Sequence, residues 1–283
     1  MRSLFALVFG VCAVLATLAT VPAMWVSQNI ADEAGYVAFA EPIARDSEFH
    51  GALADALSET LIERTQLAAP AQPVAKAAIL RVANQVSGEP GFVTAWNDTQ
   101  RRSHKIMLGD ERDLPPELDS GPSFAIDLGP LGKFVVDEVN KNLPFAITAP
   151  DQVVIPVNGA PQEQTLDHIR ETPTYARNGL IALAVSVLLA LGLARRKSVA
   201  VAWLGIGTVL SAGVLKVAAV VGVPAVLDRN TAPSPFAKAL LDTYVDRANA
   251  SFGHWLVVLA IGGGVVTAAG LVLRLAAGAK ERA

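Results

Sequence analysis

The feature that most constrains this fold is a pair of apolar runs in the middle of the chain, separated by a short basic turn. The first run covers residues 178–194 and carries no charge, and the second covers residues 199–223 with Lys216 as its only charge. Between them lie Arg195, Arg196, Lys197 and Ser198. Crossing a hydrocarbon layer roughly 30 Å thick takes about 20 apolar residues at about 1.5 Å each. Residues 178–223 are therefore expected to form a transmembrane hairpin.

Two further apolar runs, residues 4–26 and 253–273, bring the expected number of spans to four. The fold class is accordingly predicted to be mainly α. The predicted order is transmembrane helix 1 (1–27), an extracytoplasmic domain (28–177), the transmembrane hairpin (178–223), an outer loop with an amphipathic helix (224–252), and transmembrane helix 4 with a cytoplasmic tail (253–283).

The distribution of charged residues predicts how the chain is oriented in the membrane. The chain ends and the basic turn together carry seven basic residues and one acid, Glu281, whereas residues 28–177 carry 22 acids and 12 bases. Short segments rich in Lys and Arg stay in the cytoplasm. We therefore expect a multi-pass protein of the plasma membrane with both termini cytoplasmic and residues 28–177 extracytoplasmic. The acidic balance argues against nucleic acid as a partner.

The first run has two interpretations. Val21 and Ala23 have the small-residue spacing of a signal-peptide cleavage site, but the run is longer than the 7 to 15 apolar residues that are usual there, which favours an uncleaved anchor. Cys12 is the only cysteine and lies within this run, so residues 28–177 contain no disulfide and must be held together by apolar packing.

Residues 28–177 are expected to be mostly helical. From Asp46, a helix capped by Ser47 repeats Phe49, Leu53, Leu57 and Leu61 every four residues. Further helices are predicted over residues 74–86, 89–108, 131–142 and 162–171, an exposed loop over 109–121, and short strands at 123–128 and 153–157 that could form a short β-hairpin. After the hairpin, Ser234 and Pro235 start an amphipathic helix, predicted to lie on the membrane surface or to pack under the large domain.

Motifs for catalysis or cofactor binding are missing. The sequence has no phosphate-binding loop with Gly-Lys-Ser or Gly-Lys-Thr, no paired cysteines, no His-Glu-x-x-His and no Gly-x-Ser-x-Gly. The four histidines are scattered, with none three or four residues apart on a helix as a metal site would favour; they are His50, His104, His168 and His254. We predict no enzymatic activity, no metal and no cofactor.

One predicted helix carries the candidate interaction residues of the large domain. Arg101 and His104 are three residues apart and therefore neighbours, and His104 lies roughly 80° round the helix from Trp96. These side chains either form an anion or partner site or pack a corner of the domain. The likeliest partner of Arg101 is an acid of the same domain.

Small residues mark the spans. Gly207 and Ser211 in the third span, and Gly264 between Ala260 and Ala268 in the fourth, have the small-x-x-x-small spacing that lets helices approach closely. They predict either packing within this chain or a docking face for another subunit. Lys216 is interpreted as snorkelling to the interface, and the scarcity of other ionisable groups in the spans argues against a transporter or pump.

The order of features resembles that of uncharacterised actinobacterial four-span integral membrane proteins with an extracytoplasmic domain after the first span. The resemblance is carried by three groups of residues: Phe92, Trp96, Arg101 and His104; Ile126, Asp127, Leu128 and Pro130; and Val154, Ile155 and Pro156. Residues 35–45, with Tyr36 and Pro42, resemble the family loosely. The resemblance implies topology and no catalytic residues.

Taken together, these features predict a non-enzymatic accessory or scaffolding subunit of a larger membrane complex, with other membrane protein subunits and the lipid bilayer as partners. A respiratory supercomplex that joins a cytochrome bc-type complex to a terminal oxidase is one candidate, although no heme or copper ligand set is present. The alternative is an extracytoplasmic ligand-binding or sensing protein that uses Arg101, His104 and neighbouring acids.

Overall fold

The chain folds into two units, which are described separately. The computed structural model describes residues 2–64, 69–86, 89–109, 124–141, 146–157, 163–227 and 234–280. The span unit comprises residues 1–28, 171–227 and 248–283, and the packed unit comprises residues 29–170 and 228–247. Apart from Gly109, the loop predicted over residues 109–121 lies outside the described residues.

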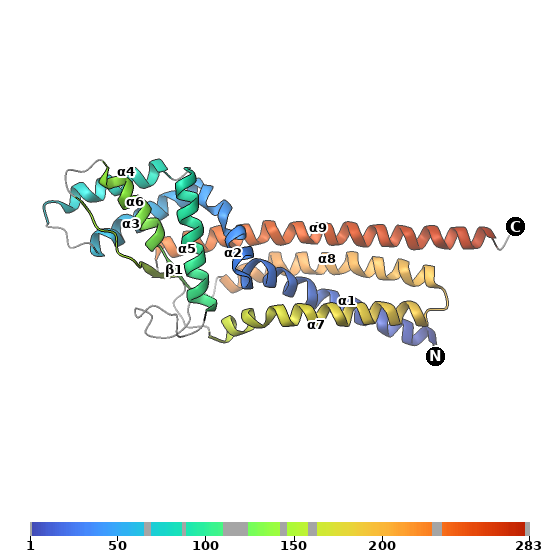
Figure 1. The fold of residues 1–283 in the computed structure, drawn as a ribbon. Coiled ribbons are helices and arrows are strands. Elements are labelled where there is room, and N and C mark those ends of the chain that lie inside the picture. Colours follow the sequence, from blue (N-terminus) through green and yellow to red (C-terminus); the bar gives the residue numbers. More distant parts are fainter. Residues whose placement is uncertain are drawn as a thin grey trace. The chain divides into compact units, whose positions relative to one another are not determined.

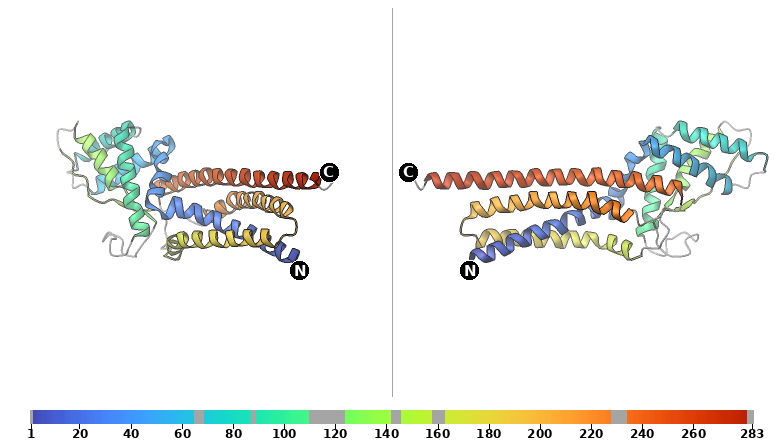
Figure 2. Two further views of the ribbon diagram at one scale, coloured as in Figure 1. Left: turned by 45° about the vertical axis from the view of Figure 1, so that its right-hand side comes forward. Right: turned by 180° about the vertical axis from the view of Figure 1, so that it is seen from behind.

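The span unit is built from α1 (Arg2–Val26) and from the long parts of α7 (Glu163–Leu193), α8 (Lys197–Leu227) and α9 (Pro235–Lys280), which run side by side (Figures 1 and 2). In the described part of the chain, four helices are long and apolar enough to cross a membrane. Each of the four predicted apolar runs thus lies almost entirely in such a helix, which fits a multi-pass membrane protein. The connection between α7 and α8 is as short as predicted, since only residues 194–196 separate the two helices.

The predicted amphipathic helix and the fourth apolar run form one continuous helix, α9. Ser234 caps its start, because the Ser234 hydroxyl accepts a hydrogen bond from the Ala237 amide at 3.0 Å. The part of α9 up to Arg247 belongs to the packed unit, and the part from Ala248 belongs to the span unit. Phe236 and Leu240 are buried in the core of the packed unit. The first part of α9 is therefore a core element of that unit.

The packed unit is mainly helical, as expected. A π-helical segment, η1 (Ser27–Ala31), leads into it, and its further elements follow in chain order. They are α2 (Glu33–Ala40), the 3-10 helix η2 (Glu41–Arg45), α3 (Ser47–Arg64), α4 (Gln72–Val86), α5 (Pro90–Leu108), β1 (Ala125–Asp127), α6 (Gly129–Asn140), β2 (Val154–Pro156), the first turns of α7 and the first part of α9.

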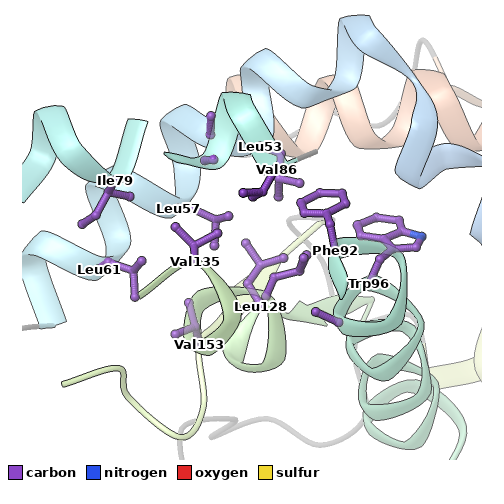
Figure 3. Packing of buried hydrophobic residues seen from close by; sticks show 14 of the residues in the cluster. Leu53, Leu57, Leu61, Ile79, Val86, Phe92, Trp96, Leu128, Val135 and Val153 are labelled. Carbon is purple, nitrogen blue, oxygen red and sulfur yellow. The ribbon is translucent and has the colours of Figure 1, made fainter. Parts of the chain in front are cut away.

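One apolar core holds these elements together (Figure 3). The predicted four-residue repeat of α3 is confirmed, because Phe49, Leu53, Leu57 and Leu61 are all buried. They pack with side chains of the other helices and of residues next to the two strands, namely Ile79, Val86, Phe92, Trp96, Leu128, Val135 and Val153. Burying a side chain of this size stabilises a fold by about 1.5–3 kcal/mol before the entropy cost, so apolar packing can hold this cysteine-free unit.

The two strands pair as predicted, but they do not form a hairpin. β1 and β2 are antiparallel with Ile126 opposite Ile155, while the chain between them contains α6. A hairpin needs a short turn between its strands. The prediction of a β-hairpin is therefore wrong in its connection and right in its pairing.

The cap of α3 also differs from the prediction. The helix begins at Ser47, but the Asp46 carboxylate accepts the hydrogen bond from the Phe49 amide at 3.1 Å. Asp and Ser are similarly good N-caps, so sequence preference alone could not choose between two adjacent capping residues.

Candidate functional site

Trp96, the first candidate interaction residue, is a core anchor. Its side chain is fully buried, and its indole N–H donates a hydrogen bond to the Ala40 carbonyl oxygen at 2.9 Å. The ring packs edge-to-face against Phe49, with centroids 5.3 Å apart. The structure therefore gives Trp96 no surface to offer a partner, and it ties α5 to α2 and α3.

His104 is buried in the same unit, about two turns further along α5 than Trp96. One of its ring nitrogens, Nε2, lies 3.1 Å from the Ile30 carbonyl oxygen, and its ring packs against Tyr36 at a centroid distance of 5.3 Å. Only 7% of the residue is exposed. This geometry matches the packing-corner interpretation of His104.

A chain of polar groups that sequence reasoning missed lies next to His104. The hydroxyl oxygens of Tyr36 and Tyr244 are 3.2 Å apart, and the Tyr244 hydroxyl donates a hydrogen bond to the side-chain oxygen of Gln100. Burial raises the pKa of Tyr36 to about 12, against a smaller opposing effect of its hydrogen bond with Tyr244. Tyr36 is therefore neutral at ordinary pH. The sequence contained one indication that Gln100 belongs to this buried region. Trp96, Gln100 and His104 are spaced four residues apart, which places all three on one face of α5.

Arg101 does not contact the polar groups of Tyr36, Tyr244 and Gln100, and its side chain is half exposed. It forms an ion pair with Asp98 at 2.5 Å and lies 3.7 Å from Glu33. The predicted acid partner in the same domain is thus present. The structure does not bring Arg101 and His104 into one pocket, because Arg101 lines an open groove to which His104 does not contribute.

This groove lies between α5 and α6 and has a volume of about 550 Å³. Its charged lining has four basic side chains, Arg101, Arg102, Lys105 and Lys133, against two acidic ones, Asp98 and Asp137. Lys133 pairs with Asp137 at 3.7 Å. The groove is therefore a basic surface in a segment whose sequence is acidic.

Asp127 lies next to Arg102 of this groove and bonds to several backbone groups. The buried carboxylate accepts hydrogen bonds from the amides of Gly129 and Val153, both at 2.9 Å, and its second oxygen lies 3.7 Å from Arg102. The Asp127 amide donates to Ser103 at 3.0 Å. Asp127 thereby joins β1, the start of α6 and the approach to β2, which is a structural role.

In the span unit, Gly207 and Ser211 serve packing within the chain. A Cβ on Gly207 would lie 2.5 Å from a methyl carbon of Val14 in α1. Ser211 is buried, and its hydroxyl donates to the Gly207 carbonyl oxygen at 2.9 Å. Gly207 therefore allows α1 to approach α8 closely, and Ser211 is buried one turn further along α8.

Gly264 differs from them, because it lies on an open face of α9. A Cβ there would meet no atom within 4 Å among the described residues. The contact between α8 and α9 uses other small residues: a Cβ on Gly263 would lie 2.9 Å from the Gly205 carbonyl oxygen, and one on Gly270 would lie 2.5 Å from the Ala202 amide nitrogen. The glycines of α9 that pack on α8 are thus Gly263 and Gly270 and not Gly264, which sequence spacing did not reveal.

Beside this contact runs an apolar groove of about 380 Å³. Gly264 and Ala268 line it from α9, and Ile206 and Leu210 line it from α8.

Lys216 is exposed on α8.

The histidines do not converge. His50 bonds to the Ala44 carbonyl at 2.8 Å, and His168 bonds to the Gln164 carbonyl of its own helix. Across the part of the chain that the structure describes, no three His, Cys, Asp or Glu side chains are arranged to hold a metal ion.

No family model matches the chain, and no curated protein and no solved structure matches it either. The resemblance to actinobacterial four-span proteins stays a prediction.

Proposed function

We propose that this protein is a non-enzymatic accessory or scaffolding subunit of a larger complex in the plasma membrane. The observation that carries the proposal is the open groove on α8 and α9, where Gly264 and Ala268 are exposed although their spacing suits close helix contact. The chain packs its own helices with Gly205, Gly207 and Gly263 instead. A transmembrane helix of another subunit fits the remaining groove.

The proposed orientation has both termini in the cytoplasm and the packed unit outside. Its support is the distribution of charge, with the basic turn at Arg195 and Arg196 at one end of the spans and an excess of acids in residues 28–177.

The candidate polar residues contact other residues of the same unit, which also supports a scaffolding role. His104 is buried against Tyr36, and Arg101 is paired with Asp98 and Glu33. A binding pocket formed by Arg101 and His104 together would have favoured ligand sensing.

The test is mild-detergent purification of the tagged full chain from its native membrane, followed by mass spectrometry of the subunits recovered in stoichiometric amounts. Subunits of a respiratory supercomplex are one expected result. Gly264→Leu should reduce recovery of the partner about tenfold or more, because a side chain there blocks the close approach of a helix.

Gly262→Leu is the matched control, since a Cβ on Gly262 also meets no atom within 4 Å among the described residues, while the residue does not line the groove. Its partner recovery should equal that of the wild type. Purification of the wild type alone, or equal loss in both variants, would contradict the proposal.

The second candidate function is extracytoplasmic binding of an anionic ligand, favoured by the basic groove between α5 and α6. The Lys105 side chain lines it and is exposed. Calorimetric titration of the full chain with inorganic phosphate should then show binding that Lys105→Gln weakens. The control, Lys141→Gln, removes a lysine that pairs with Glu138 and lies outside the groove.

A further inference from the structure

A second groove of the span unit has a different character, because it is apolar along its length and basic at one end. It lies between α1 and α8, is completed by the last turn of α7, and has a volume of about 470 Å³. This is within the usual range of small-molecule sites, about 300–1,000 Å³. Its walls include Leu7, Val11, Trp203 and Leu210, all of which are more than half exposed.

Arg195 and Arg196 line the basic end of the groove. Both are exposed, and among the described residues neither forms an ion pair within 4.0 Å. Guanidinium groups bind phosphate oxygens through two parallel hydrogen bonds. The two arginines are therefore available to an anion that carries an apolar body.

Trp203 lies seven residues after Arg196 on the same groove. At a rise of about 1.5 Å per residue, the backbone of Trp203 lies about 10 Å beyond Arg196 along the axis of α8. Trp203 therefore forms an apolar wall of the groove beyond the two arginines.

We propose that this groove binds one anionic glycerophospholipid, with its phosphate at Arg195 and Arg196 and an acyl chain along α1 and α8. Charge complementarity selects this occupant over a helix of a partner protein, because a helix brings no phosphate to the two arginines. The groove beside Gly264 has no charged lining residue, so the two grooves take different occupants. This inference does not depend on the proposed scaffolding role.

The test is native mass spectrometry of the full chain in detergent with equal amounts of phosphatidylglycerol and phosphatidylcholine that carry the same acyl chains. The wild type should retain one phosphatidylglycerol in preference to phosphatidylcholine. The double variant Arg195→Gln/Arg196→Gln should lose about 25-fold in phosphatidylglycerol retention, since each basic residue near an anionic head group contributes about a fivefold factor. Arg274→Gln, which removes an exposed arginine of α9 outside the groove, is the charge control and should retain the lipid.

Gly10→Leu tests the acyl-chain part of the groove. A Cβ on Gly10 meets no atom within 4 Å among the described residues, and Gly10 lines the groove, so leucine should fill it and abolish retention of both lipids. Gly213→Leu is the matched control, because it is equally open but does not line the groove. Equal retention of the two lipids by the wild type, unchanged retention in the double arginine variant, or loss in Arg274→Gln as large as in that variant would overturn the proposal.

Discussion

The hydroxyl oxygens of Tyr36 in α2 and Tyr244 in α9 lie 3.2 Å apart, and they connect segments 208 residues apart in the sequence. Because Tyr244 donates to Gln100, the proton shared between the two tyrosines comes from Tyr36. Both rings also stack, with centroids 6.2 Å apart. This polar chain fixes the first part of α9 in the packed unit.

Tyr244→Phe should destabilise the full chain more than Tyr36→Phe. The first change leaves the buried Gln100 oxygen without its donor and costs about 1–3 kcal/mol, whereas the second removes one hydrogen bond and costs about 1 kcal/mol. Chemical unfolding of the detergent-solubilised chain, followed by tryptophan fluorescence, measures both. A larger cost for Tyr36→Phe would contradict the order of donors inferred here.

Stability should fall between pH 10 and about 12 because of Tyr36. Its pKa is raised from 10.0 to about 12 by burial, so the unfolded chain loses the phenolic proton at a lower pH than the folded chain does. The stabilisation is fully present below pH 10 and is lost as the pH rises through this window, by about 2–3 kcal/mol in total. Unfolding of the wild type and of Tyr36→Phe at several pH values provides the measurement, and the variant should show the shallower decline.

Asp127→Ala should destabilise the chain by about 3 kcal/mol, because the amides of Gly129 and Val153 both lose a buried acceptor. Asp127→Asn keeps an acceptor oxygen and should cost about 1 kcal/mol. The exposed Asp137, which pairs with Lys133 at 3.7 Å, gives the control Asp137→Asn with an expected cost of about 0–1 kcal/mol. Denaturant unfolding compares the three variants, and equal costs for Asn and Ala at position 127 would argue against the role of this side chain as the hydrogen-bond acceptor for the two amides.

Gly263→Leu should disrupt the contact between α8 and α9, whereas Gly264→Leu should leave it intact. A Cβ on Gly263 already lies 3.0 Å from the Cβ of Thr208, and the same atom on Gly264 has open space around it within the described residues. Overpacking costs about 1–3 kcal/mol or more. Thermal unfolding in detergent checks this pair, and a melting temperature lowered equally in both variants would contradict the assigned helix face.

Helix α1 is expected to remain in the mature protein, since several contacts tie it to the span unit. Val14 packs at Gly207, and the Trp25 indole donates to the Ser251 hydroxyl at 3.1 Å. Peptide mapping of the purified chain by mass spectrometry should therefore recover peptides from residues 2–23 of α1. A mature chain whose first residue is Met24 would show instead that the first run is a cleaved signal peptide.

Local sequence patterns were sufficient to predict a helix where residues close in the sequence determine its position and length. The apolar runs, the four-residue repeat from Phe49 to Leu61 and the stop between Val86 and Pro90 all predicted their elements correctly. Length, periodicity and breaker residues act within a few turns of one helix, and the sequence displays them directly.

Contacts between distant segments could not be predicted in the same way. The sequence placed Trp96 and His104 on the correct helix but left their surroundings open. In the structure, Trp96 bonds to the Ala40 carbonyl, and His104 contacts Ile30 and Tyr36. The pairing of β1 with β2, which α6 separates in the sequence, likewise involves a distant contact, the hydrogen bond from the Val153 amide to the Asp127 carboxylate.

The sequence by itself determined the apolar spans, the basic turn and the helical character of both units, because these follow from hydrophobicity and local propensity. Only the tertiary structure decided that Gly207 packs against α1 while Gly264 stays open, and that Arg101 lines an exposed groove while His104 is buried against Tyr36. The physical reason is that a small or polar residue has the same local preference in either place, and its role depends on which neighbour occupies the space beside it.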